Sequence, residues 1–178
     1  MAKALLITRQ DIVRFTSMNG NIDTDTFIQY ISTSQDIEIQ QMLGTDLLEK
    51  IQAEIVAGTL ANPYLALLTD YIKPCLIHFA FARYLPNGAY TVSNKGIYKH
   101  NSENSDTASK EEIDYLQGTA MQTAMNYKQR FVDYMCFNSA SFPEYTSNSN
   151  GDVYPDNDIN FTGSVSYTHL TLPTSDLV

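Results

Sequence analysis

The residues that could carry acid–base chemistry are few, and most have a simpler structural explanation. Two carboxylate pairs, Glu111/Glu112 and Asp23/Asp25, have the side chains of a general acid and a general base. Each pair falls at the expected N-terminus of a helix, where the helix dipole favours negative charge. His78 lies beside the apolar stripe of a helical pattern, which favours a hydrogen-bonded structural histidine over a metal ligand. The sequence therefore predicts no catalytic residue.

Motifs for cofactors, metals and nucleophiles are also missing from the sequence. It has no P-loop, GxSxG turn or HExxH pair, and its glycines fall at expected turns rather than in a phosphate-binding cluster. Cys75 and Cys136 lie far apart within apolar helical patterns, so we expect two reduced core thiols rather than a disulfide or a zinc site. We accordingly expect no cofactor, no metal and no enzymatic activity.

The composition is acidic and suits one domain. The chain of 178 residues has 20 acidic and 11 basic residues, a formal net charge of −9. A surface that grips nucleic acid needs clustered Lys and Arg, so we expect no tight DNA binding, although DNA could slide past such a wall. No apolar run approaches the roughly 20 residues of a membrane-spanning helix, which favours a soluble protein made in the cytosol.

The end of the chain looks foreign to the fold. The segment from Val165 to Thr174, VSYTHLTLPT, is similar to one translated frame of a transposase sequencing adapter. The alternative is a genuine threonine-rich tail. We expect residues 164–178 to be non-native, adapter-derived sequence and exclude them from the fold prediction, with the natural C-terminus missing.

Five helices are expected, and each boundary has a local signal. Thr8 with Asp11, and Ser109 with Glu112, have the spacing of a capping box at the start of the first and last helices. Gly44 ends the second helix, and the two residues after it, Thr45 and Asp46, are expected to cap the third. An Asn-Pro pair begins the fourth. The expected ranges are 8–15, 23–43, 45–57, 62–85 and 109–142.

The fourth helix should be the central one, because it is apolar over much of its circumference. Pro74 lies inside it and should kink it, since a proline ring removes one hydrogen bond and clashes with the preceding turn. Its apolar stripe is Leu65, Leu68, Ile72, Leu76 and Phe79, widened by Leu67, Tyr71, Cys75 and Ala82. The stripe of the last helix is Ile113, Leu116, Ala120, Ala124, Tyr127, Phe131 and Tyr134 or Met135.

The segment between these two helices changes its period. Tyr90 and Val92 alternate with smaller residues, a turn signal follows, and Ile97 and Tyr98 resume the pattern, which predicts a small β-hairpin in residues 89–100. The predicted fold is mainly α, with a five-helix, bundle-like body in residues 1–145 and one hairpin between helices four and five. We expect residues 146–163 to form an extended or mobile polar tail.

The order of these elements resembles the head–tail connector proteins of tailed bacteriophages, also called head-completion or neck proteins. The signal lies in the order and spacing of the segments rather than in any one of them. The similar segments are ITRQDIVRF (7–15), QQMLG and TDLLEKI (40–51), NPYLALLTDYIKPCLIHFAFARYL (62–85), VSNKGIY (92–98) and FVDYMCFNSASFPEY (131–145).

This resemblance implies assembly rather than catalysis. Such proteins form rings of about twelve subunits beneath the portal, extend the DNA channel and dock the tail or a second neck protein. We therefore expect a virion subunit, made in the bacterial host cytoplasm, that contacts its own copies, the portal and the tail or a second neck protein. Double-stranded DNA would pass through the lumen without specific binding, and no membrane is involved. The residues expected to contact a subunit or the portal are Tyr90, Val92, Asn94, Lys95, Gly96, Ile97 and Tyr98.

Two alternatives stay open at this point. One is a monomeric helical bundle in which the hairpin is only a long connection. The other is a small helical ligand-binding domain or enzyme with a pocket near the Pro74 kink, lined by Tyr71, Cys75, His78 and Tyr84. A bound metal or small molecule would favour this second alternative.

Overall fold

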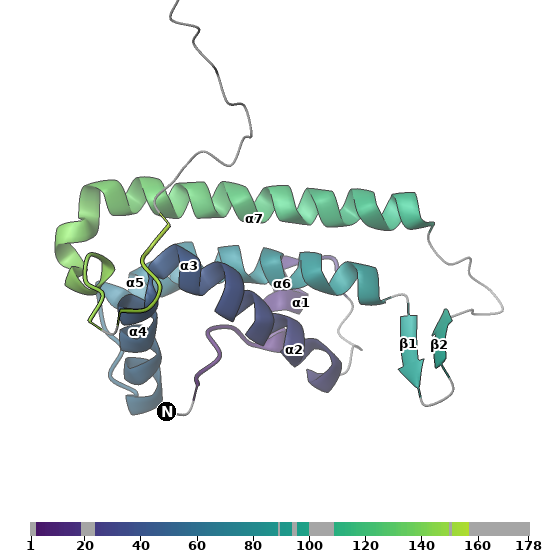
Figure 1. Ribbon diagram of the computed structural model, residues 1–178, viewed down its shortest axis with the longest axis horizontal. Coiled ribbons are helices and arrows are strands. Elements are labelled where there is room, and N and C mark those ends of the chain that lie inside the picture. The colour runs from purple at the N-terminus through teal and green to yellow at the C-terminus, as the bar shows by residue number, and fades with distance from the viewer. Residues whose placement is uncertain are drawn as a thin grey trace, which may run out of the picture.

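The computed structural model describes residues 3–18, 24–88, 90–93, 96–99, 109–149 and 151–156. Within these residues the fold is mainly helical, as predicted, with five continuous helical stretches (Figure 1). The single-helix stretches are α1 (Arg9–Phe15), α4 (Thr45–Ala57) and α7 (Lys110–Asn138). The second stretch joins α2 (Thr24–Ser34), the π-helical turn η1 (Gln35–Ile39) and α3 (Gln40–Leu43). The fourth joins α5 (Tyr64–Leu67), the π-helical turn η2 (Leu68–Ile72) and α6 (Lys73–Gly88).

Two short strands connect α6 to α7. β1 (Tyr90–Ser93) and β2 (Gly96–Lys99) pair antiparallel, with Val92 opposite Ile97. Two 3-10 turns, Ser139–Ser141 and Pro143–Tyr145, follow α7. Asn94 and Lys95 lie outside the described residues, as do residues 157–178, which include the segment predicted to be adapter-derived.

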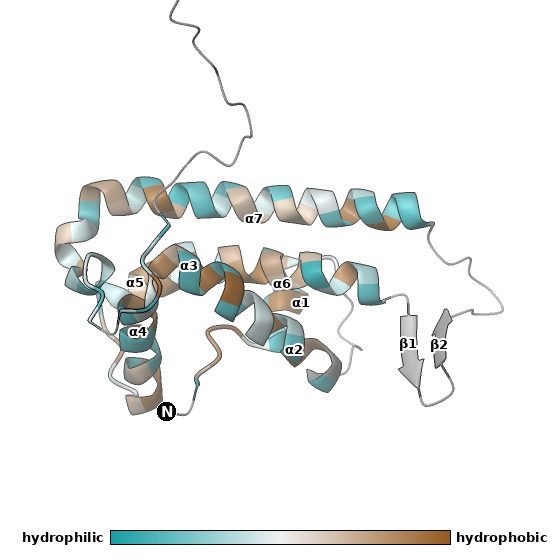
Figure 2. Ribbon diagram, in the orientation of Figure 1, coloured by the Kyte–Doolittle hydropathy of each residue, from teal (hydrophilic) through white to brown (hydrophobic). Residues whose placement is uncertain are grey.

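α6 is the centre of the molecule. α7 runs antiparallel along one side of it, while α1 and α2 pack against it from the other (Figure 1). Figure 2 shows that α6 is largely hydrophobic, whereas α7 alternates between polar and apolar residues. Leu76 of α6 and Phe131 of α7 are both completely buried, as the two predicted stripes require. The hydrophobic core therefore forms around α6.

The local helix signals are confirmed at both capping boxes. The two pairs are Thr8 with Asp11 and Ser109 with Glu112. In each, the hydroxyl of the first residue accepts from the backbone amide of the second, and the carboxylate of the second accepts from the backbone amide of the first. The N-terminus of α4 differs from the prediction. Gly44 is its N-cap residue and has no side chain that could cap the helix, while the side chains of Thr45 and Asp46 bind the tail described below.

The irregularity predicted at Pro74 lies in the turn before it. The amide of Lys73 donates to the carbonyl of Leu68, five residues back, and Pro74 follows as the second residue of α6. A proline has no N–H to donate, so the hydrogen-bond ladder must be rearranged around it. The widened turn contains one extra residue, which rotates the preceding residues around the helix axis. Leu67 therefore faces the core, and Leu65, which was predicted there, is partly exposed.

The central helix departs from the prediction in two further respects. It continues past Pro86 to Gly88, and the side-chain amide of Asn87 donates to the carbonyl of Arg83, which covers one acceptor of the last turn (3.4 Å). The stretch Tyr64–Gly88 is also long and apolar enough to cross a membrane, contrary to the expectation that no run reaches this length. Half of its most apolar window is buried inside the protein, as in the core helix of a globular domain.

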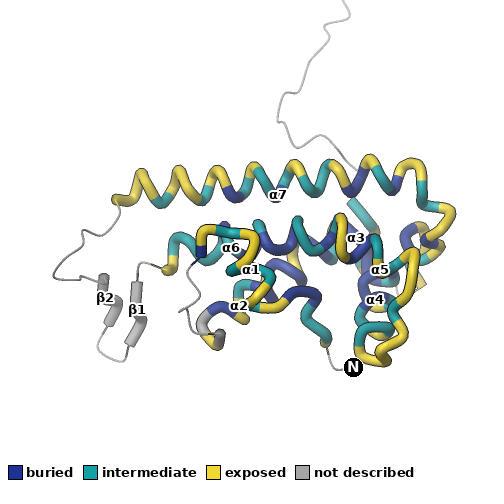
Figure 3. Tube along the Cα trace, turned by 180° about the vertical axis from the view of Figure 1, so that it is seen from behind, coloured by how far each residue is buried: buried dark blue, intermediate teal, exposed yellow. Residues whose placement is uncertain are grey.

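The outer residues of α7 give two more corrections. Cys136 is exposed rather than part of the core, although Cys75 is buried as predicted. Leu116 is 49% exposed, and the start of α7 reaches beyond the end of α6 (Figure 1). The predicted stripe is therefore buried only from Ala120 onward, and Figure 3 shows the start of α7 largely exposed.

Both ends of the described chain are bound to the helical body. The buried side chain of Gln35 accepts from the amide of Leu6 (3.0 Å) and donates to the carbonyl of Ala4 (2.9 Å), which fixes the N-terminal arm against η1. At the other end, the amide of Thr45 donates to the carbonyl of Val153 (3.0 Å). Residues 151–156, predicted to be an extended or mobile tail, form no helix or strand and are held in place by hydrogen bonds beside the Gly44 break.

Candidate functional site

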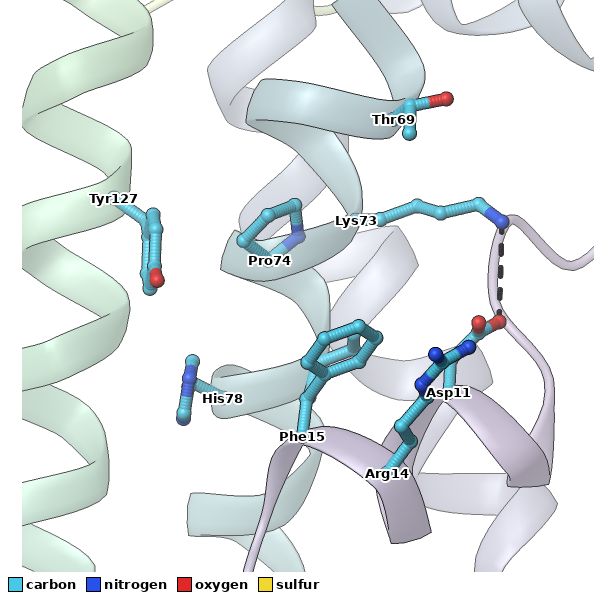
Figure 4. A pocket seen from close by; sticks show the side chains of 9 residues that line it. Asp11, Arg14, Phe15, Thr69, Lys73, Pro74, His78 and Tyr127 are labelled. Atoms are coloured by element: carbon cyan, nitrogen blue, oxygen red, sulfur yellow. Dashed lines mark ion pairs between the residues drawn. The ribbon is translucent and has the colours of Figure 1, made fainter.

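A pocket of about 380 Å³ opens between α1, the η2–α6 junction and α7 (Figure 4). Its volume is within the range of small-molecule and side-chain binding pockets. Pro74 and the buried Ile77 form part of its wall, and Phe15, 59% exposed, lies on the α1 side. The complete lining is Asp11, Arg14, Phe15, Thr69, Lys73, Pro74, Ile77, His78 and Tyr127.

Local structure explains how α1 contributes to this pocket. The capping box between Thr8 and Asp11 fixes where α1 begins, and Ile12 anchors the helix in the core. The last turn then presents Arg14 and Phe15 beside α6, as Figure 4 shows. Within α1 only Ile12 is fully buried, and Phe15 is exposed and lines the pocket.

The charges around the pocket are unequal. Lys73 lies 3.9 Å from the carboxylate of Asp11, measured from Nζ to Oδ2, and the same carboxylate accepts from the amide of Thr8 (2.8 Å). No carboxylate within the described part of the chain lies within 4 Å of Arg14, whose guanidinium is 5.8 Å from the centroid of Phe15. Two cations therefore face one carboxylate, in a protein whose overall charge is strongly negative.

The α6 and α7 walls meet at a stacked pair of rings. The centroids of His78 and Tyr127 are 5.6 Å apart and their planes are inclined by 9°. Burial lowers the pKa of His78 below its ordinary value of 6.5, because the charged imidazolium is disfavoured away from water. The imidazole is therefore neutral at pH 7. It adds a hydrogen-bonding group but no charge to the pocket.

The four residues predicted to line a pocket near Pro74 are not brought together. Only His78 lines it. Tyr71 stacks on Tyr134 with centroids 4.3 Å apart, and Tyr84 packs on Phe27 with centroids 5.1 Å apart. The prediction assumed that these side chains share one face of the helix, whereas they point in different directions and contact different partners.

Cys75 is also unsuited to chemistry in this pocket. Its thiol is buried, 3.6 Å from the carbonyl of Ala124 and 3.8 Å from the sulfur of Met42. Burial raises the pKa of Cys75, so the nucleophilic thiolate is strongly disfavoured. This side chain acts as a small core residue.

A second cavity, of about 350 Å³, lies where the tail reaches α7. It is lined in part by Met121 and Met125 of α7, and Lys128 pairs with Asp156 at its edge (3.2 Å). Within the residues that the structure describes, no group of three or more His, Cys, Asp and Glu side chains is arranged to hold a metal ion.

For the predicted contact residues of the hairpin, the structure gives the strands and their register. Tyr90 and Val92 lie in β1, and Gly96, Ile97 and Tyr98 lie in β2, with Tyr90 opposite Lys99 and Thr91 opposite Tyr98. Their role in binding a neighbour stays a prediction.

The fold and the pocket together define a mainly helical protein with a pocket between its short first helix and its two longest helical stretches. The chain belongs to DUF6712, a family of unknown function, whose model matches residues 39–155. The match includes α6, α7 and the bound tail as far as Pro155, but not α1. No curated protein and no solved structure matches the chain.

Proposed function

We propose that this protein is a structural, non-enzymatic subunit of a bacteriophage neck ring, which joins the portal to the tail and extends the DNA channel. The observation that carries the proposal is the order of the elements that resembles head–tail connector proteins. A short capped helix, a helix broken at Gly44 and a central apolar helix are followed by paired strands and one long helix.

Assembly into a ring requires two different faces on each subunit, because a ring closes through contacts between unlike surfaces. The exposed start of α7 and the pocket beside α1 are two such unlike surfaces. Phe137, at the far end of α7, is 90% exposed and adds an apolar contact point there. These features support a role in assembly more directly than a catalytic one.

The charge of the chain fits a channel that DNA passes through. A net charge of −9 disfavours tight binding of the phosphate backbone, so DNA moving through the lumen would not be held. The partners in this proposal are further copies of the chain, the portal protein and the tail or a second neck protein. The site of action is the virion neck, after synthesis in the host cytoplasm.

The hairpin β1–β2 is the proposed contact element. It projects from the end of α6, away from the helical core (Figure 1), where its edges could add to a neighbour or pack in its groove. Deleting residues 92–98 tests this role. The variant should keep the circular dichroism of a helical protein but fail to bind the portal in a sedimentation assay.

A small helical ligand-binding domain is the second candidate, and the 380 Å³ pocket favours it. Native mass spectrometry of the purified protein separates the two. A stoichiometric small molecule or metal, together with failure to bind the portal, would support ligand binding, whereas portal binding by the ligand-free chain supports the neck role.

A further inference from the structure

We propose that the pocket beside α1 receives the start of α7 from the next copy of the chain. The plug is the face of the first turns of α7 that carries Glu111, Asp114 and Tyr115, and the socket is the pocket between Arg14, Phe15, Lys73, Ile77, His78 and Tyr127. This inference rests on the proposed ring assembly and specifies the contact from which that ring is built.

The socket suits an aromatic group that carries negative charge. Phe15, Ile77 and the ring of Tyr127 provide apolar surface for such a group. Arg14 and Lys73 provide two positive charges against the single carboxylate of Asp11, which the capping box and Lys73 already use. An incoming carboxylate would therefore find an excess of positive charge, with Arg14 free of a carboxylate partner in the described part of the chain.

The plug has the complementary composition. Tyr115 is 74% exposed, which is unusual for so large a ring, and it shares a face of α7 with Glu111, four residues before it. Glu111 and Asp114 are exposed within the same first turns of α7, while Glu112 is occupied by the capping box with Ser109. Lys110 offsets one of the three negative charges of Glu111, Glu112 and Asp114, so the first turns of α7 remain acidic.

The plug cannot fill the socket of its own chain. Tyr115 and Tyr127 lie on the same continuous helix, twelve residues apart, which is about 18 Å along the axis. A tyrosine side chain is much shorter than this, and a packed helix cannot fold back on itself. Because plug and socket are fixed apart within one chain, a plug that enters the socket must come from another copy.

This contact would be heterologous, since each copy gives its plug to one neighbour and its socket to the other. Such contacts close into a ring when the rotation that relates neighbouring copies is a whole-number fraction of 360°. One exposed aromatic residue and a few charges give a weak pairwise contact, which cooperative closure or the portal would reinforce. Isolated subunits can therefore be largely monomeric while still sampling the contact.

Crosslinking between two different variants tests the contact directly. In a Cys136→Ser background, Thr69→Cys places a thiol at the socket and Gly118→Cys places one a helical turn from Tyr115. A short bis-maleimide added to the mixed proteins should give a heterodimer. Val56→Cys, an exposed position on α4, replaces Gly118→Cys as the matched control and should give little product.

Charge reversal then tests the chemistry of recognition. Arg14→Glu in the socket partner should lower the heterodimer yield about tenfold, because the incoming carboxylates would meet like charge. Pairing Arg14→Glu with a plug partner carrying Glu111→Lys and Asp114→Lys should restore much of the yield. Unchanged melting temperatures would show that each variant is folded.

The same crosslink is measured at high protein concentration in solution and on portal complexes. Product that depends on Arg14 and Tyr115 in either setting supports the contact. Its absence from both, with rings still present on the portal, would overturn the contact and leave the neck role standing. If the wild-type chain never binds the portal but the crosslink forms, the neck role fails and the contact stands.

Discussion

Pro155 lies directly against Gly44, so that a Cβ atom added to this glycine would be only 2.8 Å from Cδ of the proline ring. Gly44 also has φ of +76°, a conformation that residues with a side chain rarely adopt. The glycine that separates α3 from α4 is therefore also the position against which the tail packs. One position ends a helix, starts the next and receives a segment more than a hundred residues away in sequence.

Gly44→Ala should lower the free energy of unfolding by about 2–4 kcal/mol, because backbone strain at positive φ adds to the clash with Pro155. Urea denaturation followed by circular dichroism measures this change. Gly118→Ala is the matched control. It lies within α7 with no atom within 4 Å of the added methyl group, so it should be neutral or slightly stabilising. Equal effects of the two substitutions would contradict this account.

The bound tail should contribute to stability, whereas the terminal segment should not. Deleting residues 165–178 should leave the melting temperature unchanged, as expected of sequence foreign to the fold. Deleting 150–178 removes Val153, Pro155 and Asp156, and should lower the melting temperature by about 2–4 °C for each 1 kcal/mol lost. Differential scanning calorimetry of the two truncations checks this. A large effect of the shorter deletion would show that the adapter-like segment is part of the fold.

Leu76→Ala and Phe131→Ala should each destabilise the protein by about 2–5 kcal/mol, because both side chains are completely buried beside the central helix. Phe137→Ala removes an equally large ring from a position that is 90% exposed, and should change stability by less than about 0.5 kcal/mol. Guanidinium denaturation of the three variants separates these outcomes. Similar costs at Phe131 and Phe137 would mean that the two faces of α7 have been assigned incorrectly.

Stability should fall with pH below about 6.5 partly through His78. Its pKa in the folded state is lowered by burial, so the unfolded chain binds a proton first as the pH falls. The stabilising effect is complete above the unfolded pKa of 6.5 and is lost as the pH decreases through the lower folded value. His78→Gln should therefore flatten the dependence of melting temperature on pH in this window. An unchanged slope would mean that His78 is solvated.

Much of the fold could be predicted because its signals are local. The capping boxes at Thr8 and Ser109 depend on residues three apart, and Gly58 ends α4 in the left-handed conformation that glycine adopts easily. The phase of the central helix could not be predicted, because the π-helical turn before Pro74 adds one residue that the apolar pattern does not record. Leu65 is exposed for this reason, although it was predicted on the apolar stripe, whereas Leu67 is buried as predicted.

The pocket and the binding of the tail could not be predicted from local sequence patterns. Arg14 and Phe15 reach the pocket from a helix about sixty residues away from His78 in sequence, and no spacing rule connects them. The tail is held by backbone hydrogen bonds to Gln41 and Thr45 and also by side chains. The carboxylate of Asp46 accepts from Ser147 and Ser149, and the hydroxyl of Thr45 donates to Asp152. Local patterns favour an extended or mobile tail for a tract rich in Ser, Asn and Asp, because they do not show that its polar groups find partners beside Gly44, distant in sequence.

The central claim, that this chain is a neck-ring subunit, is tested most directly by electron microscopy of the protein mixed with the portal of the same phage. The account predicts a closed ring of added density at the exit of the portal channel, built from copies of this chain, and its loss on deletion of residues 92–98. Portal particles that remain bare with the full-length, folded protein in excess would contradict the claim.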